Sequence, residues 1–177
     1  MHNILQNALF VLLAVVVVVV LVIVLIGREQ LLVLVFGPVE LSRIDFTTLT
    51  RTTRPNQYLV CPPDVCAQKP DAVSPVYEVP ATTLRDWWLA MIAQQPRVQQ
   101  VGVSQDGWQY DLLQRSRLMR FPDSITVRFM PRGDATSTLA IYSHSHYGRS
   151  DFGVNRKRVE AWLKALPMHR FNTSESR

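Results

Sequence analysis

An uninterrupted apolar run near the start of the chain constrains the fold more than any other feature. Residues 8–26, ALFVLLAVVVVVVLVIVLI, are 19 consecutive apolar residues. A helix of this length is roughly 28 Å long, which matches the hydrocarbon thickness of a bilayer. The alternative is a cleaved signal peptide, but residues 1–7 hold no Lys or Arg and no small-x-small cleavage site follows the run. We therefore expect residues 1–27 to form an uncleaved, single-pass transmembrane anchor.

A second apolar stretch follows the anchor and is much shorter. Residues 31–36, LLVLVF, end at Gly37 and Pro38. Six residues cannot cross a bilayer as a helix, so we expect this stretch to lie at the interface or to pack against the domain. Residues 42–55 are rich in Thr and Arg and suggest a polar neck. Residues 28–55 are therefore interpreted as an interfacial segment and neck.

The remaining pattern predicts an α+β domain over residues 56–167. Residues 82–96 place apolar side chains at helical spacing and stop at a proline, and a second helix is expected from Val154 to just before Pro167. Four strand-like runs separated by short turns lie between them, at residues 97–104, 108–120, 124–130 and 137–146. Short turns favour antiparallel neighbours, so we expect a four-stranded antiparallel sheet with two helices packed on one face. Residues 168–177 suggest a polar, mobile tail.

The overall charge does not indicate a nucleic-acid-binding protein. The chain carries 19 Lys and Arg against 14 Asp and Glu, a formal net charge of +5. The cations are scattered, and no run of five or more occurs. We expect no nucleic-acid partner and no cofactor, while an anionic membrane surface remains compatible with the charge.

Two features disagree about which side of the membrane holds the domain. No Lys or Arg precedes the apolar run, whereas four arginines follow it closely, at positions 28, 43, 51 and 54, so the positive-inside rule favours the cytoplasm. Cys61 and Cys66, in CPPDVC, are the only cysteines and favour a short-loop disulfide in an oxidising compartment. Free thiols are an alternative, as is a metal site with His144 and His146, although this spacing matches no common zinc motif.

The last predicted strand sorts its polar side chains onto two faces. With a period of two, Tyr142, His144 and His146 share one face, while Ser143 and Ser145 share the other. If the helices cover the serine face, the histidines lie on an open face. A serine nucleophile needs a histidine within hydrogen-bonding reach, and these serines and histidines point apart. The strand therefore predicts no catalytic triad, and we assign no catalytic or metal-binding residue.

Two groups of residues remain as candidates for recognition and for local structure. A ligand or partner surface is predicted from cationic and aromatic side chains at Arg115, Arg117, Arg128, Tyr142, His144, His146, Arg149 and Arg156. A tight turn into the last helix is predicted from Gly148, Ser150, Asp151, Gly153 and Asn155. Glycine permits positive φ, and a Ser or Asp side chain caps a helix, so the second group is interpreted as structural.

These residues carry a resemblance to a known family. The segment IYSHSHYGRSDFGVNRKR resembles the mark S-x-S-x-x-G-x-S-D-x-G-V-N-x-x-R of the bacterial and plastid family called domain of unknown function 1499. The matching positions are Ser143, Ser145, Gly148, Ser150, Asp151, Gly153, Val154, Asn155 and Arg158. RPNQYLVCPPDVC is similar to the Asn- and Pro-rich opening of the same family, so the likeness spans about residues 54–166. No activity is established for this family, but its members often look exported, which implies a periplasmic domain.

Three functional hypotheses follow. The first is a membrane-anchored, non-enzymatic accessory or assembly protein, a subunit of a larger complex in the bacterial inner membrane, with its domain in the periplasm. Its partners are then the membrane and another membrane protein or protein complex. The second is a binding module for an anionic small molecule or a lipid headgroup. The third is an enzyme of unknown reaction.

Overall fold

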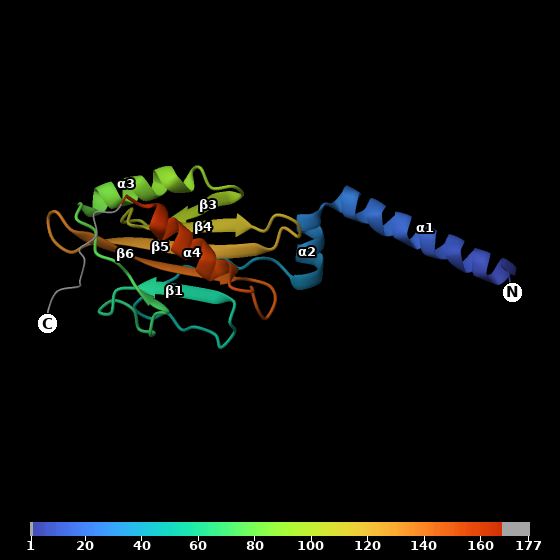
Figure 1. Cartoon of the computed structure of the whole chain (residues 1–177), viewed down its shortest axis with the longest axis horizontal. Coiled ribbons are helices and arrows are strands. Elements are labelled where there is room, and N and C mark those ends of the chain that lie inside the picture. The colour runs from blue at the N-terminus through green and yellow to red at the C-terminus, as the bar shows by residue number, and fades with distance from the viewer. Residues whose placement is uncertain (1, 168–177) are drawn as a thin grey trace.

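A long apolar helix stands apart from the rest of the chain in the computed structural model, which describes residues 2–167. Helix α1 (His2–Ile26) extends away from the domain, and helix α2 (Arg28–Phe36) lies between it and one end of the sheet (Figure 1). The window Gln6–Leu25 is long and apolar enough to cross a membrane and is not buried by the rest of the chain. α1 therefore has the properties of a membrane span or of a signal sequence. The predicted tail, residues 168–177, lies outside the described residues.

The second apolar stretch packs against the domain. α2 is 9 residues long and is separated from α1 by Gly27, whose φ of 84° allows the sharp change of direction. Leu32 is buried, and the Phe36 ring stacks on Tyr147 with 4.9 Å between ring centroids. The two sequence alternatives for this stretch were the interface and the domain surface, and contact with the domain is confirmed.

The sheet is larger than the sequence predicted and is mixed. Its six strands are β1 (Gln57–Cys61), β2 (Ala72–Val73), β3 (Val98–Val103), β4 (Gln109–Arg115), β5 (Pro122–Pro131) and β6 (Ser137–Ser145), in the order β2-β1-β6-β5-β4-β3. The four predicted strands are β3 to β6, and they form the expected antiparallel meander. β1 joins β6 antiparallel, and β2 pairs with β1 in parallel. The α+β class is confirmed, but the expectation of only four antiparallel strands is wrong.

The two missed strands lack the local signals on which strand prediction depends. Four of the five residues of β1, QYLVC, are buried, so its burial does not alternate. β1 also lies in a Pro-rich stretch, and β2 is only 2 residues long. β1 owes its place to β6, more than 80 positions later in the chain, as in the pairing of Tyr58 with Ser143. Such a non-local pairing leaves no periodic trace in the sequence.

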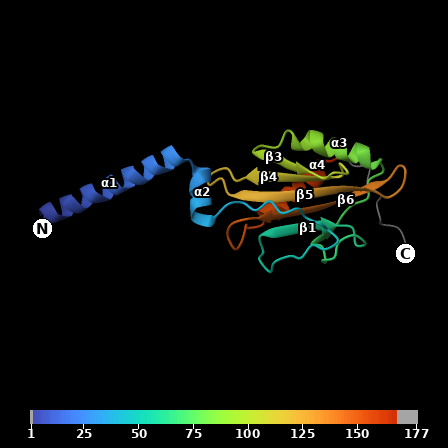
Figure 2. The same ribbon diagram turned by 180° about the vertical axis from the view of Figure 1, so that it is seen from behind.

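Both domain helices cover one face of the sheet, as predicted. α3 (Ala81–Ile92) and α4 (Val154–Ala165) lie on the same side of the strands in Figures 1 and 2. Trp88 of α3 and Trp162 of α4 meet edge to face, 5.7 Å apart, above Ile125 and Ile141 of the sheet. Burying such large aromatic side chains supplies much of the stability of a domain of this size.

The opposite face of the sheet is covered, which corrects the prediction of an open face. Residues 38–50, here called the strap, run from α2 across this face (Figure 2). Phe46 and Leu49 of the strap pack with Leu59, Ala140 and Tyr142 in a second, smaller core. The sequence does not indicate this role because single apolar residues of the strap alternate with charged and hydroxyl-bearing residues.

The cysteines form the predicted disulfide. Cys61, the last residue of β1, is bonded to Cys66 in the turn that follows. The disulfide alternative is therefore confirmed over free thiols and over a metal ligand pair. The bond lies at the margin of the second core, where it fixes the strand to its turn.

Candidate functional site

The turn between β6 and α4 is organised by one carboxylate. Asp151 Oδ1 accepts the backbone N–H of Gly153 at 2.9 Å, and Oδ2 accepts the backbone N–H of Asn155 at 2.7 Å. Gly153 has a φ of 77°, a left-handed conformation that costs glycine little. Ser150 Oγ accepts the N–H of Phe152 at 3.3 Å in the same turn. These contacts satisfy N–H groups that would otherwise be unpaired at the helix start.

Asn155 connects this turn to the interior. The residue is fully buried, and its Oδ1 accepts the Ser143 hydroxyl at 2.6 Å. Its Nδ2 donates to the Ser145 hydroxyl at 3.0 Å and to the backbone carbonyl of Asn56 at 3.1 Å. Asn56 in turn donates its amide to the carbonyl of Gly148 at 3.1 Å. The segment that begins the family resemblance, at Asn56, and the S-x-S-x-x-G segment, residues 143–148, are therefore held together by the side-chain amide of Asn155.

A buried ion pair completes the network. Arg158 of α4 bonds to Asp123 of β5, and their side chains are only 8% and 10% exposed. The same guanidinium donates to Ser143 Oγ at 2.9 Å and to Asn155 Oδ1 at 2.6 Å, and it also contacts Gln114. A buried charge is tolerated when it is paired and its remaining donors are bonded, as here. The network therefore fastens α4 to the sheet.

The two histidines lie on the face of the sheet opposite α3 and α4, where one of them contacts a serine of the neighbouring strand. The rings of Tyr142, His144 and His146 form a column with centroid distances of 5.0 and 5.2 Å. Ser124 Oγ lies 2.7 Å from His146 Nε2, and Ser124 is the β5 residue paired with His144. Single-strand reasoning missed Ser124 because it comes from the neighbouring strand, and only the β5–β6 register could have identified it.

Both histidines are held in the neutral form. Burial lowers the pKa of His144 from 6.5 to about 4, and repulsion from His146 when that ring is protonated adds to the effect. Burial also lowers the pKa of His146, against the opposing influence of Asp123. Neutral imidazoles carry no positive charge at pH 7, so this column does not attract an anion through charge.

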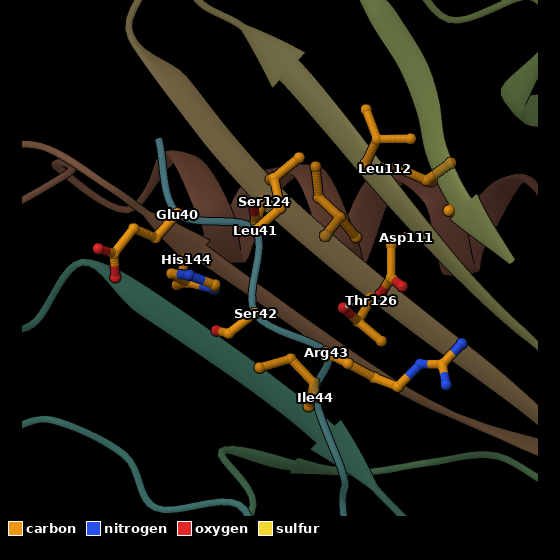
Figure 3. A pocket seen from close by; sticks show the side chains of 13 residues that line it. Glu40, Leu41, Ser42, Arg43, Ile44, Asp111, Leu112, Ser124, Thr126 and His144 are labelled. Carbon is orange, nitrogen blue, oxygen red and sulfur yellow. Dashed lines mark hydrogen bonds between the residues drawn. The ribbon is translucent and has the colours of Figure 1, made fainter. Parts of the chain in front are cut away.

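A groove of about 230 Å³ lies between the strap and the sheet (Figure 3). The strap supplies residues 40–44 as one wall, and Ser124, Thr126 and His144 line the sheet side. His144 Nδ1 is buried and has no hydrogen-bond partner among the described residues. Thr126 donates its hydroxyl to Asp111 at 2.7 Å. The groove thus combines polar side chains with one unsatisfied ring nitrogen, which makes it a candidate site for a small polar ligand.

Residues 50–166 match the family described as Protein of unknown function (DUF1499). The chain belongs to the DUF1499 family. No curated protein matches the chain.

The DUF1499 match contains the whole buried network, from Asn56 to Arg158, and both histidines. It leaves out α1, α2 and nearly all of the strap, because it begins at residue 50. The groove is therefore composite: its sheet side belongs to the DUF1499 domain, and the strap wall, residues 40–44, precedes the match.

The arginines of the predicted surface are not gathered into one patch. Arg128 pairs with Asp106 at 2.7 Å on the strap side, whereas Arg156 pairs with Glu160 at 2.8 Å on α4. Arg115 lies 3.4 Å from Glu29 of α2. The other two, Arg117 and Arg149, are exposed in loops. Tyr142 packs against the strap, His144 lines the groove beside it, and His146 contacts Ser124, so the structure separates the predicted set into several places.

One end of the DUF1499 domain binds α2. Glu29 of α2 forms ion pairs with Arg120 at 2.6 Å and with Arg115 at 3.4 Å. At the other end of α2, Tyr147 stacks on Phe36 and donates its hydroxyl to the carbonyl of Gly37 at 2.7 Å. We call this set of contacts the α2 dock.

Within residues 2–167, no cluster of three or more His, Cys, Asp or Glu side chains is arranged to hold a metal ion.

Proposed function

We propose that the protein is a membrane-anchored, non-enzymatic accessory or assembly protein that presents its DUF1499 domain to a partner in the same membrane. The α2 dock is the observation that carries this proposal. It replaces a flexible linker between α1 and the domain with ionic and aromatic contacts at both ends of a nine-residue helix. A fixed orientation relative to the membrane matters for a protein that must meet a membrane partner face to face.

The interior of the domain supports the same proposal. Ser143, Asn155 and Arg158, three positions of the resemblance to the family mark, bond to one another in a buried network behind α4. Their hydrogen-bonding capacity is used to hold the fold. A rigid domain with covered sheet faces is suited to offering its outer surface to a partner.

Native solubilisation in mild detergent tests this function. We expect the wild-type protein to migrate with a complex much larger than its own 20.2 kDa. Glu29→Lys removes both ion pairs of the dock and should shift the protein towards the monomer, while the control Asp86→Lys, on α3, should not. A wild-type monomer that carries a co-purified small ligand would instead support a binding module.

That binding module is the second candidate function. The observation in its favour is the groove with His144 Nδ1, which has no hydrogen-bond partner in the part of the chain that the structure describes. An anionic small molecule or lipid headgroup would find the guanidinium of Arg43 at the groove edge, although Glu40 and Asp111 line the same space. An enzyme remains the third hypothesis, and the Ser124–His146 hydrogen bond is its starting point.

We also propose that the protein is a single-pass protein of the bacterial inner membrane with its domain in the periplasm. The Cys61–Cys66 disulfide supports an oxidising compartment. Two of the four arginines on which the opposite, cytoplasmic orientation depends also make contacts within the fold. Arg51 pairs with Asp71 at 2.7 Å, and Arg28 donates to the carbonyl of Leu118 at 3.0 Å. The positive-inside rule counts these arginines whatever they contact in the fold and favours the cytoplasm, and the proposal gives the disulfide more weight.

Fusions at the C-terminus test the orientation. Alkaline phosphatase, which is active only after export, should be active when fused after Arg177, and a fluorescent protein that matures only in the cytoplasm should stay dark. The reverse pattern would place the domain in the cytoplasm and leave the disulfide without an oxidising compartment.

A further inference from the structure

We propose that the end of the domain nearest α1 seats directly on the bilayer and prefers anionic lipid. The contact surface, here called the docking patch, consists of Leu34 and Val35 of α2 and of Leu118 and Met119 in the β4–β5 loop, with Arg28 and Arg117 beside them. This inference rests on the proposed function in one respect, that α1 spans the membrane.

The apolar part of the docking patch is unusually exposed for a folded domain. Leu34 and Val35 are 75% and 64% exposed, and Leu118 and Met119 are 74% and 57% exposed. Arg28 Nη1 at the start of α2 donates to the carbonyl of Leu118, so the loop tip is tied to the helix. The four side chains therefore belong to two elements that meet at Arg28, and exposed apolar side chains on adjoining elements mark an interaction surface.

Covalent continuity with α1 identifies the bilayer as the occupant. Only Gly27 separates the end of α1 from the start of α2. If α1 spans the membrane, α2 begins at the depth of the lipid headgroups, and its nine residues extend only about 14 Å from that point. One side of α2 faces the domain, as Leu32 does. Leu34 and Val35 are not covered by the domain and are therefore available to the headgroup and acyl-chain boundary.

The charge around the docking patch selects the lipid. Arg28 and Arg117 are exposed and form no ion pair with any residue of the described chain. Arg115 and Arg120 lie around a single carboxylate, that of Glu29. Four arginines against one glutamate give this end an excess of positive charge. An arginine at an anionic surface shifts the ratio of docked to undocked domain by about fivefold, so anionic headgroups are favoured.

Depth-dependent fluorescence quenching tests the seating on the full-length protein. Both native cysteines are in the disulfide, so Leu118→Cys provides one labelling site for an environment-sensitive dye, and Val73→Cys on β2 provides the control. Val73 is also exposed, at 64%, but lies at the far edge of the sheet from β4. The protein is reconstituted in phosphatidylcholine vesicles with or without phosphatidylglycerol, and quenching by headgroup spin-labelled lipid is measured.

We expect strong quenching at position 118, greater with phosphatidylglycerol, and little at position 73. Arg117→Gln should lower the docked ratio about fivefold, whereas Lys164→Gln at the end of α4 should leave it unchanged. Equally weak quenching at both positions in both lipids would overturn the proposal. If the dye at position 118 is shielded from water, and this shielding fades as the lipid-to-protein ratio rises, then a second copy of the protein covers the patch and the proposal is wrong.

Carbonate extraction of the same vesicles distinguishes a failure of lipid docking from a failure of the α1 anchor. A protein that is retained after extraction but unquenched at position 118 has an anchored α1 and no lipid docking. A protein that is extracted lacks the anchor on which the proposed function depends.

Discussion

Replacing Arg158 with methionine is expected to lower the free energy of unfolding by about 3–5 kcal/mol, because it leaves the Asp123 carboxylate buried without its partner. The two side chains are only 8% and 10% exposed, so water cannot replace the lost contact. Ser143 and Asn155 also lose the guanidinium that donates to their oxygens. The measurement is a urea titration of the full-length protein in mild detergent, followed by near-ultraviolet circular dichroism.

Two further variants distinguish the effect of breaking the buried ion pair on stability from the effect of losing a positive charge in general. Arg156→Met removes a cation two residues away, but its pair with Glu160 is exposed and is worth about 0–1 kcal/mol at most. Asp123→Leu combined with Arg158→Met removes both charges and should be less destabilising than Arg158→Met alone. If Arg156→Met and Arg158→Met cost the same, the network does not hold α4 in place.

The sequence was sufficient for features that repeat along a single element. The period of two placed Ser143 and His144 on opposite faces of β6, and the structure has Ser143 bonded to Asn155 on the helix side. Helical spacing located α3 and α4, and the apolar run located α1. In each case the signal is the burial pattern of one element, which its own residues carry.

The features that were missed depend on contacts between distant segments. Ser124 reaches His146 only because β5 and β6 pair in one particular register, and Asp123 reaches Arg158 across 35 positions. Residues 42–55 are predicted as a polar neck, yet Phe46 within them is buried in the second core. An isolated phenylalanine in a Thr-rich segment gives no periodicity, so its burial could not be inferred from neighbouring residues.

Lowering the pH from about 6.5 to 4 is expected to destabilise the folded protein by about 3 kcal/mol through His144 alone. Burial lowers the pKa of His144 from 6.5 to about 4 in the folded state, so only the unfolded chain takes up this proton across that interval. Because the unfolded state binds more protons there, stability falls as the pH falls, and the loss levels off once the pH is below the folded pKa of about 4. Protonation of His144 in place would bring a charge beneath the strap.

His144→Phe tests this origin of the acid sensitivity. Phenylalanine keeps an aromatic ring against Tyr142 but cannot be protonated, so the variant should have a clearly smaller slope of stability against pH between 6.5 and 4.5. A residual slope is expected from His146, because burial lowers the pKa of that ring as well. The lowered pKa values of the carboxyls of Asp45 and Asp64, held down by hydrogen bonds from Thr47 and Arg132, act in a different range. Their contribution is lost only as the pH falls below their ordinary value of 3.8 and through their folded pKa values, outside this interval. Urea titrations of both proteins at several pH values measure the difference, and an equal slope in the variant would show that His144 is already accessible to protons in the folded state.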